Sequence, residues 1–196
     1  VIALEKAAQR ISDFHEKQIP NNISYTDDNN VELASRWTPL DSVGLYVPGG
    51  KASYPSSVIM TAIPAKIAKV PEVSMCVPSP KGYLNPSILV AAKICGVDNI
   101  YKIGGAQAVA AMAYGTNTIK RVNKIFGPGN AWVAEAKRQL FGKVGIDMVA
   151  GPSEILVISD DKSNPNWIAT DLLSQAEHDT ESQSILITDN IEFAIK

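Results

Sequence analysis

Hydrophobic positions at the start of the chain recur with the periodicity of an α-helix. Leu4, Ala7, Ala8, Ile11 and Phe14 fall on one face of a helix with about 3.6 residues per turn. A single apolar stripe of this kind predicts an amphipathic helix whose stripe packs against a core.

A different pattern follows this helix. Pro20 and the polar residues at 21–22 begin a loop, and the run of Asp and Asn at 27–30 is a turn signal between two short extended runs. The two runs and the turn predict an antiparallel ribbon.

From about residue 41 the chain alternates between short apolar runs and helical patterns. The apolar runs predict strands at 43–47, 73–77, 100–103 and 124–126. Each is followed by a predicted helix, at 56–69, 86–95, 105–114 and 130–141. Strands that alternate with helices are typical of a parallel α/β sheet, in which right-handed crossovers bring the loops after the strands to one edge.

A second alternation begins after residue 152, with strands predicted at 155–159 and 184–188 and a helix predicted at 165–178. We predict an α/β fold with a Rossmann-like parallel sheet domain at 41–152. The segments 1–40 and 153–196 are predicted to be parts of a second α/β domain. Because the chain begins and stops within helical patterns that lack cap and stop signals, we expect it to be a piece of a longer protein.

Composition narrows the classes of protein. Among 196 residues, 18 Lys and Arg oppose 20 Asp and Glu, and no basic block indicates an extended nucleic-acid footprint. No apolar run approaches the ~20 residues that span a bilayer, and the N-terminal residues do not have the layout of a signal peptide. Cys76 and Cys95 lie in apolar segments, so we expect buried free thiols in a cytoplasmic protein.

Three glycine-rich loops are predicted at the carboxyl edge of the sheet, at 48–50, 104–105 and 127–130. Each leads into a helix whose first N–H groups can receive an anion. The last comes nearest to a dinucleotide loop, although Trp132 stands where the third glycine of G-x-G-x-x-G would be. Glycine turns in any α/β domain would look the same. Tyr46, at a strand end, is a candidate to stack on or hydrogen-bond a nucleotide, or is simply a half-buried tyrosine.

A second candidate site lies on the predicted helix 165–178. Gln175 and His178 are three residues apart and share a face, so an amide oxygen and an imidazole could ligate one metal ion. A histidine at a helix end can equally be a partner of the helix dipole. With two histidines and two buried cysteines, the chain cannot form a complete His/Cys zinc site by itself. Ser153 lies in a turn without a nucleophile elbow and is more typical of a substrate contact.

Taken together, the motifs resemble the histidinol dehydrogenase family. They occur in family order from about residue 36 to the end, at 43–50, 104–108, 124–130, 146–148, 151–154 and 171–178. The resemblance implies oxidation of L-histidinol to L-histidine with two NAD⁺ and a zinc-bound substrate. It also implies a homodimer, whose partner subunit supplies one zinc ligand.

The resemblance assigns roles to six residues. Tyr46, Gln107 and Asn130 match the residues that contact NAD. Ser153 matches a residue that contacts histidinol, and Gln175 and His178 match zinc ligands that also touch the substrate.

The chain departs from the family in length, because family members are about twice as long. The resemblance places the catalytic Glu–His pair and the remaining Asp and His zinc ligands beyond residue 196. It implies no catalytic residue within this chain, which we therefore expect to be inactive alone. Two alternatives remain open: an inactive remnant that keeps a dinucleotide-binding fold, and a related NAD-dependent dehydrogenase of another amino alcohol. Zinc binding that fails to strengthen with histidinol would favour the second.

Overall fold

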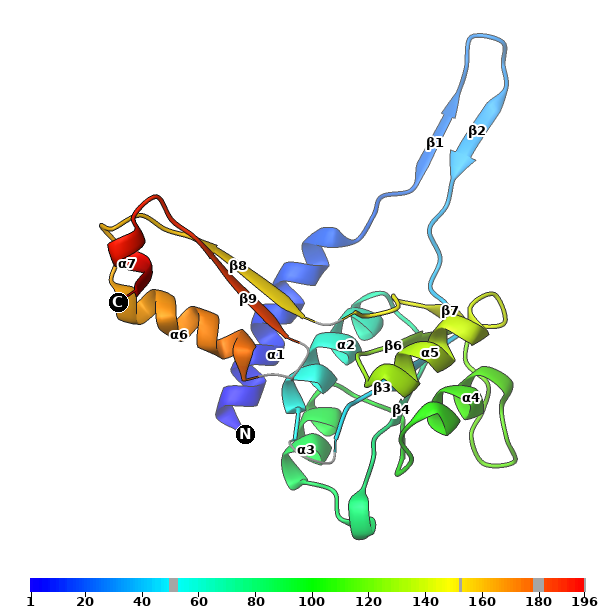
Figure 1. Ribbon diagram of the computed structural model, residues 1–196. Helices are drawn as coiled ribbons and strands as arrows, with labels where there is room; N and C mark the ends of the chain where they lie inside the picture. The colour runs from blue at the N-terminus through cyan, green and yellow to red at the C-terminus, as the bar shows by residue number, and fades with distance from the viewer. Residues whose placement is uncertain (50–52, 152, 178–181, 196) are drawn as a thin grey trace. The chain divides into compact units, whose positions relative to one another are not determined.

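The computed structural model describes residues 1–49, 53–151, 153–177 and 182–195 (Figure 1). By its internal contacts the chain divides into two compact units, Val1–Val149 and Ala150–Lys196, and each is described by itself. The predicted grouping of 1–40 with 153–196 into one second domain stays a prediction. None of the described helices is both long enough and apolar enough to cross a membrane.

The first unit is built on a parallel sheet, as predicted, and this sheet has five strands. Its strand order is β5–β4–β3–β6–β7. The strands are β3 (Ser42–Tyr46), β4 (Glu72–Cys76), β5 (Asn99–Tyr101), β6 (Lys124–Phe126) and β7 (Gly145–Ile146). The helices that connect them are α2 (Pro55–Ile67), α3 (Pro86–Ile94), α4 (Ala106–Tyr114) and α5 (Ala131–Leu140), and a 3₁₀ turn η2 lies at Pro80–Gly82. The fifth strand, β7, was not predicted, because two residues carry no periodic pattern.

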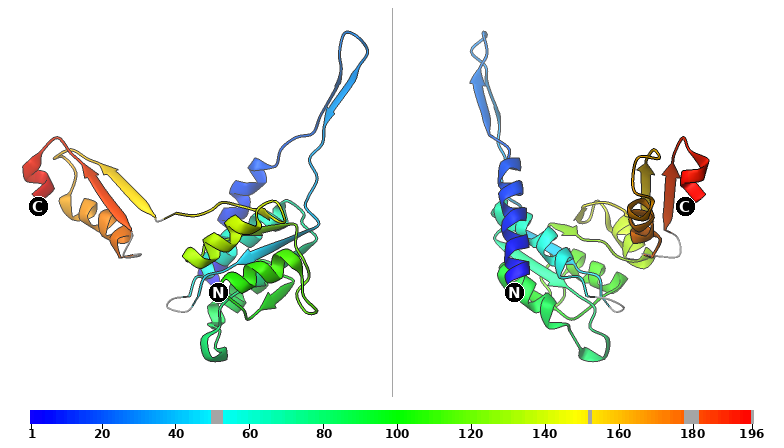
Figure 2. Two further views of the ribbon diagram at one scale, coloured as in Figure 1. Left: turned by 45° about the vertical axis from the view of Figure 1, so that its right-hand side comes forward. Right: turned by 90° about the vertical axis from the view of Figure 1, so that its left-hand side faces the viewer.

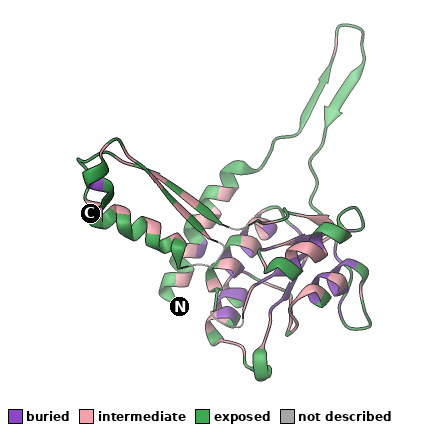
Figure 3. Ribbon diagram, in the orientation of Figure 1, coloured by how far each residue is buried: buried purple, intermediate pink, exposed green. Residues whose placement is uncertain are grey.

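Helices lie on both sides of this sheet (Figure 2), and many positions of the sheet and of the helices on it are buried (Figure 3). The buried residues form two hydrophobic clusters. Alternate residues of β3 point to opposite faces. Val43 and Leu45 join the cluster that contains residues of α1, α2 and α3. Tyr46 joins the cluster formed with α4 and α5. A parallel strand buried on both faces is apolar along its whole length, which explains the continuous run in the sequence.

The N-terminal segment largely follows the prediction. The helix α1 (Ile2–His15) buries Ala8 and packs Leu4, Ala7 and Ile11 on the first cluster. Phe14, at the end of the same helix, is 61% exposed and lies outside that cluster. Helical periodicity identifies the side of a helix that is apolar, but it does not show how far along the helix the packing extends.

Beyond α1 come a 3₁₀ turn, η1 (Glu16–Gln18), and the predicted antiparallel ribbon of β1 (Ile23–Thr26) and β2 (Glu32–Ser35). Asp27 forms its turn by accepting hydrogen bonds from the N–H groups of Asn29 and Val31, at 2.8 and 2.9 Å.

The second unit contains a parallel strand pair. β8 (Glu154–Ile158) pairs with β9 (Gln183–Ile187), and α6 (Pro165–Ala176) connects them before the short helix α7 (Ile191–Ile195). Asn164 caps α6, with its side chain accepting from the N–H of Asn166 at 2.9 Å. The helix predicted to reach residue 178 ends at Ala176.

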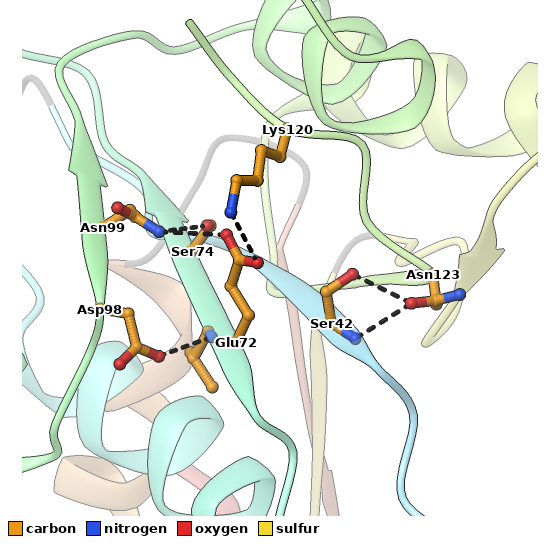
Figure 4. A network of polar contacts seen from close by, with 8 residues as sticks. Ser42, Glu72, Ser74, Asp98, Asn99, Lys120 and Asn123 are labelled. Atoms are coloured by element: carbon orange, nitrogen blue, oxygen red, sulfur yellow. Dashed lines mark hydrogen bonds and ion pairs between the residues drawn. The ribbon is translucent and has the colours of Figure 1, made fainter.

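A polar network closes the amino edge of the five-stranded sheet (Figure 4). Asp98 accepts a hydrogen bond from the N–H of Val73 at 2.8 Å, at the start of β4. Asn123 accepts hydrogen bonds from the N–H and the hydroxyl of Ser42 at 3.0 and 2.9 Å. Glu72 accepts from Asn99 and Lys120, each at 3.3 Å.

Candidate functional site

The strand order places a topological switch point between β3 and β6. From β3 the chain runs outward through β4 to β5, then returns to β6 on the other side of β3 and continues to β7. In open α/β sheets, ligands bind outside the carboxyl ends of the two strands at this point. Tyr46 is the last residue of β3 and Gly127 directly follows β6, so both lie at this crevice.

Tyr46 links two loops of the predicted site. Its side chain is 4% exposed, and its hydroxyl accepts a hydrogen bond from the N–H of Gly105 at 2.9 Å. Gly105 is the N-cap of α4, the helix on which Gln107 lies. The buried ring presents no face for stacking in this conformation. The hydroxyl keeps its own hydrogen, which it can donate to a ligand.

Gln107 lies in the first turn of α4 and is exposed. Its side chain lies close to the backbone of Gly105. A Cβ placed on Gly105 would be 2.8 Å from the Oε1 of Gln107. Gly104, one residue earlier, packs so closely on Pro78 that any side chain there would overlap the proline ring. The structure therefore brings Tyr46 and Gln107 together around a tightly packed glycine pair.

Asn130 is the N-cap of α5. Its Oδ1 accepts a hydrogen bond from the N–H of Val133 at 3.1 Å, and the residue is exposed. Because the side-chain oxygen is used by the cap, the amide nitrogen is the group that can reach a ligand. The capping role was missed in the sequence, although Asn directly before a helical pattern is the usual signal for it.

Gly127 joins the loops after β3 and β6. Its φ is +116°, and a Cβ at this position would overlap the carbonyl oxygen of Tyr46. Only glycine combines this backbone conformation with such a close approach. Two more residues at this loop, Lys137 and Asp147, contact Gly127 and were not singled out in the sequence as site residues. Gly50, from the first predicted glycine loop, lies outside the described residues.

Among the described residues of the first unit, two cavities stand out by size. One, of about 220 Å³, lies at the carboxyl edge between Pro48, Val77 and Tyr83. The other, of about 680 Å³, is mostly apolar and has Trp37, Met60 and Pro128 in its lining. Tyr46, Gln107 and Asn130 line neither of them, but Gly127 and Pro128 of the loop after β6 line the larger one.

The remaining predicted site residues belong to the second unit. Ser153 directly precedes β8 and is exposed. Gln175 is near the end of α6 and half-buried, and its Nε2 donates to the hydroxyl of Ser182 at 3.4 Å. In this orientation the amide oxygen is the atom that could coordinate a metal. His178 lies outside the described residues.

A zinc site is not completed by the residues that the structure describes. They contain no group of three or more His, Cys, Asp or Glu side chains placed to hold a metal ion. The amide oxygen of Gln175 is one donor of suitable chemistry, and zinc sites need at least three protein ligands.

The two cysteines are buried free thiols, as predicted. Burial raises the pKa of Cys76 to about 12 and that of Cys95 to about 11. Since the thiolate is the reactive form, neither thiol is a nucleophile at neutral pH.

Comparison with known proteins identifies relatives over the whole chain. The sequence pattern of the family described as histidinol dehydrogenase matches residues 1–196. Histidinol dehydrogenase 1 of Nostoc sp. is 65% identical over 98% of this chain and 44% of its own length. Histidinol dehydrogenase of Rhodospirillum rubrum is 64% identical, with the same shares covered.

A solved structure agrees with these relatives. The crystal structure of histidinol dehydrogenase from Elizabethkingia anophelis matches with a TM-score of 0.92 and 44% identity. The match covers 96% of this chain and 44% of that one. The chain thus spans somewhat less than half the length of the relatives it matches.

Proposed function

The chain belongs to the histidinol dehydrogenase family, and from this premise we propose that it forms the NAD-binding part, together with part of the zinc and substrate site, of an enzyme that oxidises L-histidinol to L-histidine. The observation that carries the proposal is the crevice between β3 and β6, where Tyr46, Gly127 and the N-terminus of α5 meet at the sheet edge typical of dinucleotide sites.

NAD⁺ supplies the hydride acceptor for two successive oxidations. The residues of this chain bind and orient it. The amide nitrogen of Asn130 and the hydroxyl of Tyr46 each have a hydrogen to donate, and Gln107 offers an exposed amide beside Gly105. The N–H groups at the N-termini of α4 and α5 lie at this edge, and such groups favour an anion like the pyrophosphate of NAD⁺.

Zinc, when bound, polarises and orients the substrate. Gln175 and His178 are proposed to contribute two of its ligands, and Ser153 a contact to histidinol. The hydrogen bond from Gln175 Nε2 to Ser182 supports this assignment, because it uses the amide nitrogen and leaves the amide oxygen as the possible ligand atom. The zinc ligands that complete the site, and the general base, are proposed to come from outside these residues.

Assembly and location follow the same proposal. A homodimer would complete the zinc site with a ligand from the partner subunit. A cytoplasmic location is consistent with the two buried free thiols, which a reducing compartment preserves.

The proposal is tested by NAD⁺ binding to this chain, measured by isothermal titration calorimetry with two variants at Asn130. Asn130→Ala removes both the cap and the amide, so we expect weaker NAD⁺ binding and a loss of about 1 kcal/mol in unfolding free energy. Asn130→Ser keeps a capping oxygen but lacks the amide nitrogen. We expect it to retain stability and still to bind NAD⁺ more weakly.

Two results would count against the assignment. If Asn130→Ser bound NAD⁺ with the affinity of the unmodified chain, Asn130 would act only as the N-cap of α5 and would not contact NAD⁺. Failure of the unmodified, folded chain to bind NAD⁺ would contradict the proposed function.

A further inference from the structure

A buried charge lies on α5, directly beside the proposed nucleotide loop. Lys137 is 2% exposed although it is a lysine in the middle of a helix. A buried ammonium group is costly unless it is paired and hydrogen-bonded. Its Nζ forms an ion pair with Asp147 and donates to the carbonyl oxygen of Gly127 at 3.0 Å. The lysine is therefore satisfied by one side chain and by one backbone group of the loop.

The carboxylate of Asp147 contacts the same glycine from its other oxygen. Asp147 directly follows β7, and its Oδ2 accepts a hydrogen bond from the N–H of Gly127 at 2.8 Å. Its Oδ1 also accepts from the N–H of Met148 at 2.7 Å, which fixes the carboxylate to its own backbone. Both polar backbone groups of Gly127 are thus bound by one ion pair.

Gly127 is the residue at which the direction of the loop is set. With a φ of +116° and no space for a Cβ against Tyr46, it adopts a conformation that other residues avoid. It is followed by Pro128, Gly129 and Asn130, which lead into α5. A change at Gly127 would therefore move the first turn of α5 and the side chain of Asn130.

Core stability alone does not require charges at these positions. A buried ion pair replaced by apolar side chains of similar size is often neutral or stabilising. What an apolar pair cannot supply is directional hydrogen bonding to the N–H and the C=O of one peptide segment. The ion pair of Lys137 and Asp147 supplies both.

We propose that Lys137 and Asp147 are positioning residues for the nucleotide: they hold Gly127 so that Asn130 and the first turn of α5 face the NAD⁺ site. The inference rests on the proposed function and names residues that act through the loop without touching NAD⁺ themselves. Asp147 is 26% exposed at its side chain, so the pair lies at the border between the core and the crevice.

The first test compares Lys137→Met with Arg138→Met in the 196-residue chain. Both remove a cationic head from α5, but Arg138 forms an exposed ion pair with Glu135 and does not contact the loop. We expect Lys137→Met to weaken NAD⁺ binding by at least about 10-fold and to speed amide exchange at Gly127 by a similar factor. Arg138→Met should stay within about twofold of the unmodified chain in both. Equal effects of the two variants would overturn the proposal.

The second test separates positioning from simple stabilisation. The double variant Lys137→Met with Asp147→Leu replaces the ion pair by apolar groups and leaves no unpaired buried charge. We expect its thermal midpoint to lie above that of Lys137→Met, because no lone charge is buried, and below that of the unmodified chain, because the N–H and C=O of Gly127 lose their partners. NAD⁺ affinity should stay low and exchange at Gly127 should stay fast. Recovery of NAD⁺ affinity together with the midpoint would show a merely structural pair. Because the double variant has no lone charge, it also decides the matter if Lys137→Met alone fails to fold.

Failure of the proposed function and failure of the positioning role can be told apart by experiment. If the unmodified chain folds but does not bind NAD⁺, the proposed function fails, and the role of the pair is then decided by amide exchange alone. Faster exchange at Gly127 in the double variant would support the holding of the loop, and unchanged exchange would overturn it.

Discussion

The two edges of the five-stranded sheet differ in how their polar groups are used. At the amino edge, Asp98 and Asn123 accept hydrogen bonds from N–H groups at the starts of β4 and β3, and Glu72 accepts from the side chains of Asn99 and Lys120 (Figure 4). At the carboxyl edge the loops consist largely of glycine and proline, and the polar side chains there bond mainly to backbone groups. Tyr46 accepts from Gly105, and Asn130 accepts from Val133.

This difference indicates which edge is built to bind a ligand. A network whose donors and acceptors bond within the protein stabilises the sheet and leaves little for a ligand. Loops held in place by side chains beneath them keep first-turn N–H groups directed outward from the helices. In this fold, backbone held at close approach is therefore a better mark of the site than an abundance of polar residues.

The largest expected loss of stability comes from adding a side chain at Gly127, where the backbone lies very close to the carbonyl oxygen of Tyr46. Gly127→Ala places a Cβ against the carbonyl oxygen of Tyr46 at a φ of +116°. We expect a loss of about 3–5 kcal/mol in unfolding free energy, measured by urea denaturation.

Gly142→Ala is the matched control, because Gly142 also has a positive φ, of +94°, but open space around its Cβ position. It should cost only the backbone strain, about 1–2 kcal/mol. Equal losses in the two variants would mean that the contact with Tyr46 does not constrain the loop.

A smaller effect is expected at the amino edge, and it should not reach the ligand. Asp98→Ala leaves the N–H of Val73 without its acceptor and removes the ion pair with Lys66. We expect a loss of about 1–2 kcal/mol in unfolding free energy and no change in NAD⁺ affinity. A fall in NAD⁺ affinity would break the distinction between the two edges.

The same variant predicts a pH dependence. Desolvation raises the pKa of Asp98, but the hydrogen bonds from Lys66 and Val73 and the charge of Lys66 lower it by more, so the net shift is downward. A lowered pKa in the folded state gives stability that is present above the unfolded value of about 3.9 and is lost as the pH falls through the folded value. The stability gap between the unmodified chain and Asp98→Ala should therefore be constant at neutral pH and shrink below about pH 4. A gap that widens in acid would contradict this.

The smallest expected effect separates the hydroxyl of Tyr46 from its ring. Tyr46→Phe keeps the buried ring and removes the acceptor for Gly105. We expect a loss of about 1 kcal/mol in unfolding free energy together with weaker NAD⁺ binding. Tyr114→Phe, on the exposed side of α4, should change neither. If Tyr46→Phe lost stability alone, the hydroxyl would serve only to join the two loops.

Much of the fold could be predicted from the sequence, because hydrophobic periodicity and glycine or proline boundaries identify long elements. The four longer strand–helix units, the ribbon and the second alternation all follow from such patterns. β7 could not be predicted, because it has only two residues and is defined by backbone pairing with β6, which leaves no pattern in the sequence. Phe14 shows a related limit, because the sequence does not reveal where a packing partner ends.

The sequence indicated candidate ligand contacts more readily than the buried residues that hold the loops in place. Tyr46 lies at the end of one predicted strand and Asn130 in the loop after another, and the strand order places the two strand ends side by side. The contribution of Lys137 could not be foreseen, because a lysine in a helix is usually solvated and its burial depends on Asp147, which lies ten residues further along the chain. Contacts between distant residues of this kind become visible only in the folded structure.

The central claim is that the carboxyl edge, and not the amino edge, receives NAD⁺. The most direct test follows the backbone amide resonances of the ¹⁵N-labelled chain during titration with NAD⁺. We expect saturable shifts at 104–107 and 127–133, with none at Ser42, Val73, Asp98 and Asn123. Shifts concentrated at the amino edge, or no saturable shift in the folded chain, would contradict it.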